Sequence, residues 1–307
     1  MTRFSASRAS SQGGFVIVAV LWLLAALAAL VTVFSIYLSN SARALAVTDE
    51  AVQAEGLVSA GVELTAYQLQ LAGEETRPAH GSFHTRLSGV DIAVGFVSEA
   101  ARIDLNAAPK ELIAGLLTVL GASAEGAKEY ADRIIAWRTK ATENDRGKED
   151  ALYRAAGRTY APRQAPFAHI NELALVLGLS PALVARALPY VTVFSGAAGV
   201  DALTAAPEVI AALPGMTPLL LKQFLDDRGS LANDKAAIAA ALGPAAASAS
   251  AQKGRAYRIE VRLRFPNGRQ TTSEIVIRLG KEKEDDPYRV LSWQNDVPML
   301  RRVSTEF

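Results

Sequence analysis

The chain has 307 residues, 32 Lys and Arg against 31 Asp and Glu, a formal charge of +1, and no cysteine. This length allows about two domains. The charge balance argues against a polybasic nucleic-acid binder and against an acidic disordered tail. The absence of cysteine excludes a disulfide framework, a thiol nucleophile and cysteine-ligated metal sites. Half of the residues are apolar, which indicates a globular protein.

The N-terminus combines a short basic leader with one long apolar segment. Residues 1–14 carry Arg3 and Arg8 and no acid, and residues 15–38 follow without a charge. A helix of this length extends roughly 36 Å, enough to cross a hydrocarbon core about 30 Å thick. Because the positive residues precede the segment, the positive-inside rule places the N-terminus in the cytoplasm and the remainder of the chain outside.

Three interpretations of this segment remain open. One is a plain signal anchor. A cleaved secretory signal would use Ala44–Ala46, but the apolar core of such signals spans only about 7–15 residues. The Gly14–Phe15 junction behind a basic leader resembles a type IV prepilin leader, in which prepilin peptidase cuts after the glycine and methylates the new N-terminal phenylalanine. In the anchor, Phe15, Trp22 and Tyr37 would contact the membrane.

The fifth residue counted from Phe15 is Ala19. Proteins with prepilin leaders mostly carry glutamate at this position, where it is thought to pair with the N-terminal amine of the neighbouring subunit ahead. A carboxylate in the bilayer is costly and needs such a partner. Ala19 therefore fits a subunit at the tip of a filament, with no neighbour ahead of it. In a plain anchor helix, Ala19 has no such meaning.

We expect the helix to continue beyond the membrane and to end near Leu71. Residues 40–71 contain no proline, and Leu57, Leu64 and Leu71 recur every seven residues. This spacing predicts an apolar face that packs on a globular head. Residues 39–98 would therefore hold the rest of the helix and the first strands of a β domain, which alternate in the strand manner at 83–87 and 90–97.

Residues 99–250 are predicted to form an inserted helical domain of helix-hairpin-helix, or SAM-like, character. It contains two repeats, at about 103–195 and 196–245. Each has a motif of the form [N/T]-A-A-P, a helix, a glycine hairpin and a second helix that closes on arginine, Arg138 or Arg228. Asn106 is expected to cap the first helix.

Helix-hairpin-helix units often bind the DNA backbone, so that function must be weighed. Residues 101–250 hold 15 basic and 15 acidic side chains, which gives them no net charge. In the second hairpin, Pro218 removes an amide that would otherwise face a phosphate. These features favour a protein-contact domain, with a membrane-anchored DNA-binding protein of the competence kind as the alternative.

The C-terminal residues 251–307 are predicted to return to strands of the β domain. The segment at 257–265 alternates apolar residues with Arg258, Glu260, Arg262 and Arg264, so the arginines are expected on a solvated or partner-binding face. The further predicted elements are an alanine-rich linker at 245–251, a hairpin turn at 266–268, and strands at 271–279 and 290–293.

Several motifs follow one another in an order that is specific to one family. They are an N-A-A-P start at 106–109, a W…GxED..Y loop from Trp137 to Tyr153, a YxPxNxPF-like stretch at 160–167 with Gln164 in place of asparagine, and an N-E-L helix start at 171–173. With the leader, this order resembles type II secretion system protein K, a family of minor pseudopilins.

The resemblance implies both a fold and a function. The fold would be α+β, with a pilin-like long N-terminal helix packed on an antiparallel β-sheet and a large all-α insertion. The function would be that of a non-enzymatic assembly subunit at the tip of the secretion pseudopilus. Expected partners are the minor pseudopilins I and J, the major pseudopilus subunit, prepilin peptidase, the membrane and, as a further candidate, the secreted substrates, with no nucleic acid.

The same resemblance implies a location. The chain would be a single-pass protein of the bacterial inner membrane with its C-terminal domain in the periplasm. A minor pilin of a type IV pilus remains an alternative from the residues alone. The sequence shows no arrangement of residues that predicts catalysis.

A calcium site is also implied near the acidic loop. Glu149 and Asp150 match the acidic pair of the family, while the acids that usually follow the tryptophan are replaced by basic residues and threonine at 138–140. Glu143 and Asp145 are further candidates in a shifted register. Ca²⁺ takes roughly six to eight oxygen ligands. The spacing is not that of an EF-hand, so a solvated charged loop is the alternative.

Overall fold

The computed structural model describes residues 13–143, 147–231, 234–249, 254–281, 286–295 and 297. The chain divides into two compact units, one up to Leu57 and one from Val58 onward. A single helix of 59 residues, α1 (Gly13–Leu71), begins the described chain, and the short helix α2 (Gly73–Thr76) follows it. Within α1, Val16–Ser41 is long and apolar enough to cross a membrane, and the side chains of this stretch are exposed.

A five-stranded antiparallel sheet forms the β part of the second unit. Its strand order is β1-β2-β5-β6-β7, so β1 and β7 are the edges. The helical insertion leaves the sheet after β2 and returns at β5, which pair directly with each other. The strand bounds are β1 (His80–Leu87), β2 (Val90–Ser98), β5 (Ala256–Arg264), β6 (Gln270–Leu279) and β7 (Tyr288–Gln294).

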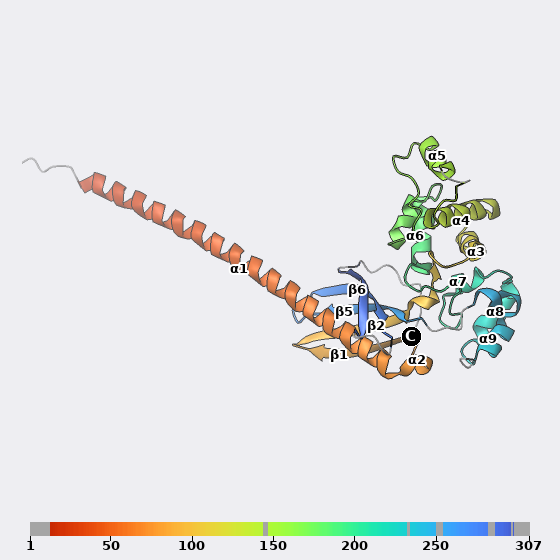
Figure 1. The fold of residues 1–307 in the computed structure, drawn as a ribbon. Helices are drawn as coiled ribbons and strands as arrows, with labels where there is room; N and C mark the ends of the chain where they lie inside the picture. The colour runs from red at the N-terminus through yellow and green to blue at the C-terminus, as the bar shows by residue number, and fades with distance from the viewer. Residues whose placement is uncertain are drawn as a thin grey trace, which may run out of the picture. The chain divides into compact units, whose positions relative to one another are not determined.

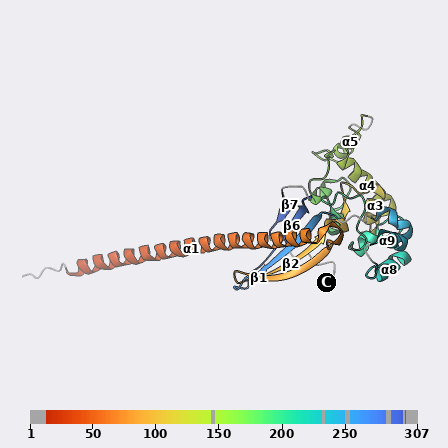
Figure 2. The ribbon, with the colours of Figure 1, turned by 60° about the horizontal axis from the view of Figure 1, so that its bottom comes forward.

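The C-terminal part of α1 packs along one face of this sheet (Figures 1 and 2). A Cβ atom added at Gly61 would lie 3.3 Å from Val94 and 3.4 Å from Val261, so the helix backbone approaches β2 and β5 closely. The buried apolar side chains of this part of the helix are Val58, Val62, Ala66 and Leu69.

The predicted packing face of α1 is wrong in part. Leu57 is buried, but Leu64 is 38% exposed and Leu71 is 69% exposed. At about 100° per residue, Leu64 and Leu71 lie on the side of the helix away from Val62 and Leu69. The seven-residue spacing therefore marks a second apolar face, which the sheet does not cover.

Short helices make up most of the insertion between β2 and β5 (Figure 1). The α-helices are α3 (Lys110–Val119), α4 (Ala124–Arg138), α5 (Lys148–Ala155), α6 (Pro181–Ala187), α7 (Pro207–Ala211), α8 (Pro218–Asp227) and α9 (Lys235–Leu242). The 3₁₀ helices are η1 (Glu99–Ala101), η2 (Ile170–Leu175), η3 (Leu188–Tyr190) and η4 (Gly243–Ser248).

Three local predictions for the insertion need correction. It is not entirely helical, because β3 (Ile103–Asp104) and β4 (Val191–Thr192) pair in parallel. Asn106 does not cap α3, which begins after Pro109 without a side-chain cap. The alanine-rich stretch expected to be a linker forms η4 up to Ser248, with Ala245 fully buried. In each case a tertiary contact overrides the local pattern.

Candidate functional site

The residues that carry the family motifs come together in the insertion around Trp137. Its ring stacks on Phe167, with centroids 6.0 Å apart at 24°, and lies 6.2 Å from the ring of Tyr153. Tyr160 meets Tyr153 edge-on at 5.8 Å. Burial raises the pKa of Tyr153, whose hydroxyl oxygen accepts a hydrogen bond from the Leu177 amide. This aromatic cluster holds α4 and α5 against the irregular segment that follows them.

Two polar side chains of the motifs complete this packing. The Asn106 amide donates to the Phe167 carbonyl at 3.0 Å and accepts from the Phe167 amide at 2.7 Å. Glu172 accepts from the Trp137 indole N–H at 3.2 Å and from Arg163 at 2.6 Å. Because these groups satisfy one another, the motifs serve as the framework of the domain and leave no free reactive group.

The acidic pair lies in the first turn of α5. Glu149 Oε2 and Asp150 Oδ1 are both buried and have no hydrogen-bond partner among the described residues. Glu143 is exposed, and Asp145 lies outside the described residues. No group of three or more His, Asp or Glu side chains suited to a metal is found in the described part of the chain.

The hairpins of the two repeats are occupied by the protein's own groups. Gly178 and Gly215 both adopt positive φ, and the Arg133 guanidinium donates to the Leu177 carbonyl beside the first. A Cβ at Gly215 would lie 3.2 Å from Pro244. After the Gly215 hairpin, the amide of Leu220 already donates to the Thr217 hydroxyl. These hairpins therefore present fewer free amides than a phosphate-binding hairpin requires.

A buried charge cluster lies where the chain leaves the sheet, and the sequence did not predict it. Glu99 is fully buried, and Arg258 of β5 donates from Nε to its Oε1 at 2.8 Å. Arg258 also pairs with Glu274 of β6. The expectation that Arg258 is solvated is therefore wrong, because η1 covers this end of its face. Arg262 and Arg264 are more exposed, as expected.

Opposing effects set the pKa of Glu99. Burial alone would raise it, but the charges of Arg258 and Arg102 and hydrogen bonds from Arg258 and Thr192 hold the pKa below its usual value. The carboxyl is therefore ionised across the neutral range.

The predicted processing and anchor residues all lie on α1. Gly14 and Phe15 fall in its first turn, and their side chains lie outside what the structure describes. Ala19 is exposed, as are Trp22 at 75% and Tyr37 at 66%. This exposure of apolar side chains is expected of a helix whose solvent is lipid.

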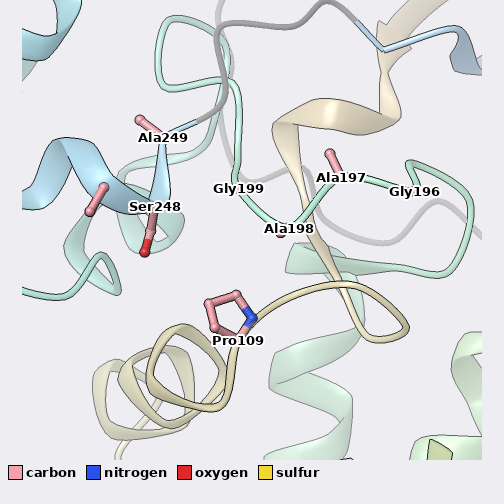
Figure 3. A pocket seen from close by; sticks show the side chains of 8 residues that line it. Pro109, Gly196, Ala197, Ala198, Gly199, Ser248 and Ala249 are labelled. Atoms are coloured by element: carbon pink, nitrogen blue, oxygen red, sulfur yellow. The ribbon is translucent and has the colours of Figure 1, made fainter.

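One cavity of about 330 Å³ lies beside the insertion's entry and exit segments (Figure 3). Its lining comes from Pro109, residues 196–199 and residues 247–249. Apart from the Ser248 hydroxyl, the lining side chains offer no polar group. The cavity therefore lacks the convergent polar groups that a ligand site typically has.

A long apolar N-terminal helix packed on an antiparallel sheet, with a helical insertion between two adjacent strands, defines a pilin-like subunit with a single membrane-anchor helix. Residues 95–196 match the family model described as type II secretion system (T2SS), protein K. The chain thus carries a domain of the protein K family, which confirms the resemblance found in its motifs.

A solved structure agrees with this assignment. The chain is similar to a chain in the crystal structure of the GspK-GspI-GspJ complex from the enterotoxigenic Escherichia coli type 2 secretion system. The TM-score is 0.61 at 18% identity, covering 82% of this chain and 98% of the other, a likeness that establishes the α+β fold. A comparison with curated proteins gave no match. Family match and fold together support a minor pseudopilin of the type II secretion system and do not favour the DNA-binding alternative.

Proposed function

We propose that this protein caps the tip of a type II secretion pseudopilus, as a non-enzymatic subunit in complex with the minor pseudopilins I and J. In this proposal it is a single-pass protein of the bacterial inner membrane with its head in the periplasm. The major pseudopilus subunit lies below the complex, and secreted substrates contact the head. The observation that carries the proposal is the second apolar face of α1, which nothing in the described chain covers.

This second face consists of Leu64, Tyr67 and Leu71, spaced three and four residues apart. Tyr67 is 59% exposed, and Leu71 is 69% exposed. The opposite side of the helix is already buried against the sheet. Apolar residues at spacings of three and four form the seam through which one helix packs on another. The occupant we propose is the long helix of a partner pseudopilin.

Co-purification of the full chain with proteins I and J in detergent tests this face. Changing Leu64 and Tyr67 together to serine should weaken the complex at least tenfold, because both side chains would lose their packing. The matched control is Leu219→Ser, which removes an apolar side chain of equal exposure (68%) from α8 of the insertion. Unchanged co-purification of the Leu64/Tyr67 variant, or equal loss in the control, would contradict the proposal.

The processing site is proposed at Gly14 and Phe15. Cleavage after Gly14 by prepilin peptidase would leave methylated Phe15 as the mature N-terminus and Ala19 as its fifth residue. Mass spectrometry of the protein isolated from membranes should find this N-terminal peptide. An intact leader, or cleavage after Ala46, would overturn this part of the proposal. A tip position agrees with Ala19, since no subunit ahead needs a carboxylate partner.

We also propose a calcium site at Glu149 and Asp150, with Glu143 and Asp145 as further ligands. The residues fit calcium in one respect: one oxygen of each member of the pair is buried and has no partner in the described chain. A hard cation that takes carboxylate oxygens would satisfy both. These two residues would hold the ion, and the ion would neutralise them and fix the start of α5.

Calorimetric titration of the metal-free protein with calcium chloride tests this site. The variant with Glu149→Gln and Asp150→Asn should lose the binding heat. The matched control is Glu129→Gln with Asp132→Asn on α4, two exposed carboxylates that already have basic partners. No binding heat in the unaltered protein, or the same heat in both variants, would refute the site.

A further inference from the structure

The sheet and the insertion have separate hydrophobic cores. The buried apolar cluster of the insertion runs from Ile103 to Ala245 and, among the residues the structure describes, contains no residue of the five-stranded sheet. The chain passes between the two parts through η1 on the way out and reaches β5 on return. A shared apolar core therefore does not fix the orientation of the insertion on the sheet.

The charge cluster at this crossing connects the two parts instead. Both carboxylate oxygens of Glu99 are used: Arg258 donates to Oε1 at 2.8 Å and to Oε2 at 3.3 Å, and the Thr192 hydroxyl donates to Oε2. Arg258 belongs to β5 of the sheet, whereas Thr192 belongs to β4 of the insertion. One buried carboxylate is thus bonded to both parts at once.

We propose that Glu99, Arg258 and Thr192 form an ionic lock that holds the insertion in a single orientation on the sheet. Apolar contacts tolerate sliding, because they have no preferred direction. A buried carboxylate is satisfied only where its donors are aligned, and any rotation leaves a charge without a partner in a region of low dielectric. Glu274 secures the other end of Arg258, which restricts where the guanidinium can point.

The other described polar contacts between the two parts are weaker. The Asp201 amide donates to the Ala100 carbonyl at 2.8 Å, and this bond stays within the connecting segments. Gln294 of β7 lies 3.2 Å from the His169 ring, but both side chains are exposed. Exposed contacts of this kind exchange readily with water. The lock at Glu99 is therefore the contact whose loss should change the orientation most.

Spin-label distance measurement can test the lock directly, because the chain has no cysteine of its own. Leu87→Cys at the end of β1 and Leu219→Cys on α8 place labels on exposed sites in the sheet and in the insertion. In the full chain, the distance distribution should be a single narrow peak. Glu99→Gln should at least double its width, while circular dichroism shows that both parts stay folded.

The matched control is Glu260→Gln. Glu260 pairs with Arg262 on the same strand at 2.6 Å, but the pair is partly exposed and lies wholly within the sheet. The control should keep the narrow peak. Thr192→Val removes one bond of the lock and keeps the ion pair, so it should broaden the peak by a smaller amount and remains informative if Glu99→Gln unfolds.

Three results would overturn the proposal. The first is a broad distribution in the unaltered chain, which would mean that the lock does not fix the orientation. The second is an unchanged narrow peak in a folded Glu99→Gln protein or in Thr192→Val. The third is equal broadening in Glu260→Gln, which would show that any charge loss on β5 has the same effect.

Discussion

The two repeats of the insertion begin alike and differ in what packs on them. In each, an aspartate accepts from the amide two residues on: Asp104 from Asn106 at 2.7 Å and Asp201 from Leu203 at 3.1 Å. In each, the closing arginine returns to the turn that precedes the first helix. Arg138 donates to two carbonyls there, and Arg228 donates to one.

The difference lies in the segment that follows the first repeat. Residues 139–176 form α5, η2 and a long irregular stretch, and they pack on Trp137 and Asn106. The second repeat is followed only by α9 and η4. The comparison teaches that one turn-and-helix unit serves as a bare helical pair in one place and as a platform in another. The family match at residues 95–196 covers the platform.

The largest expected effect comes from breaking the platform. Trp137→Ala would remove a buried ring that contacts two other aromatic rings, and should lower the free energy of unfolding by about 3–5 kcal/mol. Urea unfolding followed by circular dichroism would measure this. Leu219→Ala, at an exposed position of the second repeat, should change stability by less than about 0.5 kcal/mol. A Trp137 variant as stable as this control would contradict the platform.

The contact that joins the two repeats should show itself in alkali. Tyr190 lies between the repeats, and burial together with the Glu208 carboxylate raises its pKa to about 12 from the ordinary value of 10.0. The folded state therefore keeps the Tyr190 proton between pH 10 and 12 while the unfolded state loses it. Stability from this group is complete below pH 10 and falls as the pH rises toward 12.

Tyr190→Phe removes this contribution. Between pH 9 and pH 11.5 the unaltered protein should lose up to about 2 kcal/mol more stability than Tyr190→Phe loses. Urea unfolding at the two pH values gives both differences. Equal losses in the two proteins would show that the hydroxyl of Tyr190 does not hold its proton in the fold.

Periodicity predicted the elements of the fold because their patterns are local. The 24 uncharged residues from Phe15 and the alternation at 257–265 each dictate an element without reference to the rest of the chain. The same reasoning failed for Asn106, whose partner Phe167 lies 61 residues away. A polar residue before a helix predicts a cap only when no distant partner competes for its side chain.

The candidate site was harder to predict for a related reason. Alternation correctly separates Arg258 from the apolar residues of β5, but it does not reveal that η1 covers one end of that face. The spacing of Leu64 and Leu71 was recognised, yet it was assigned to the sheet when Val62 and Leu69 fill that position. A pattern shows that a face is apolar, and only the tertiary structure shows which partner it meets.

The closing arginines provide a test of intermediate size. Arg138→Met should cost about 2–3 kcal/mol, because two carbonyls lose a charged donor, whereas Arg228→Met should cost about half as much for its single bond. Methionine keeps most of the aliphatic length, so the comparison isolates the guanidinium. Thermal and urea unfolding of both variants would measure the ratio. Equal costs would mean that the second carbonyl bond of Arg138 contributes nothing.

The smallest effect concerns the aspartates that start the repeats. Asp201→Ala should cost about 1 kcal/mol, the usual value for loss of a capping acceptor, since Asp201 accepts from the Leu203 amide and the Thr204 hydroxyl. Asp104→Ala should cost more, because Asp104 is buried and also accepts from the Gly196 amide at 2.7 Å.

Asp201→Asn is the matched control for this pair, because the asparagine side chain keeps one oxygen that can accept from the Leu203 amide. It should therefore recover most of the stability lost in Asp201→Ala, as measured by urea unfolding. If Asp201→Asn were as unstable as Asp201→Ala, the negative charge would matter more than the acceptor. If Asp104→Ala cost no more than Asp201→Ala, the contacts of Asp104 across the first repeat would add nothing, and the two turns would be energetically equal.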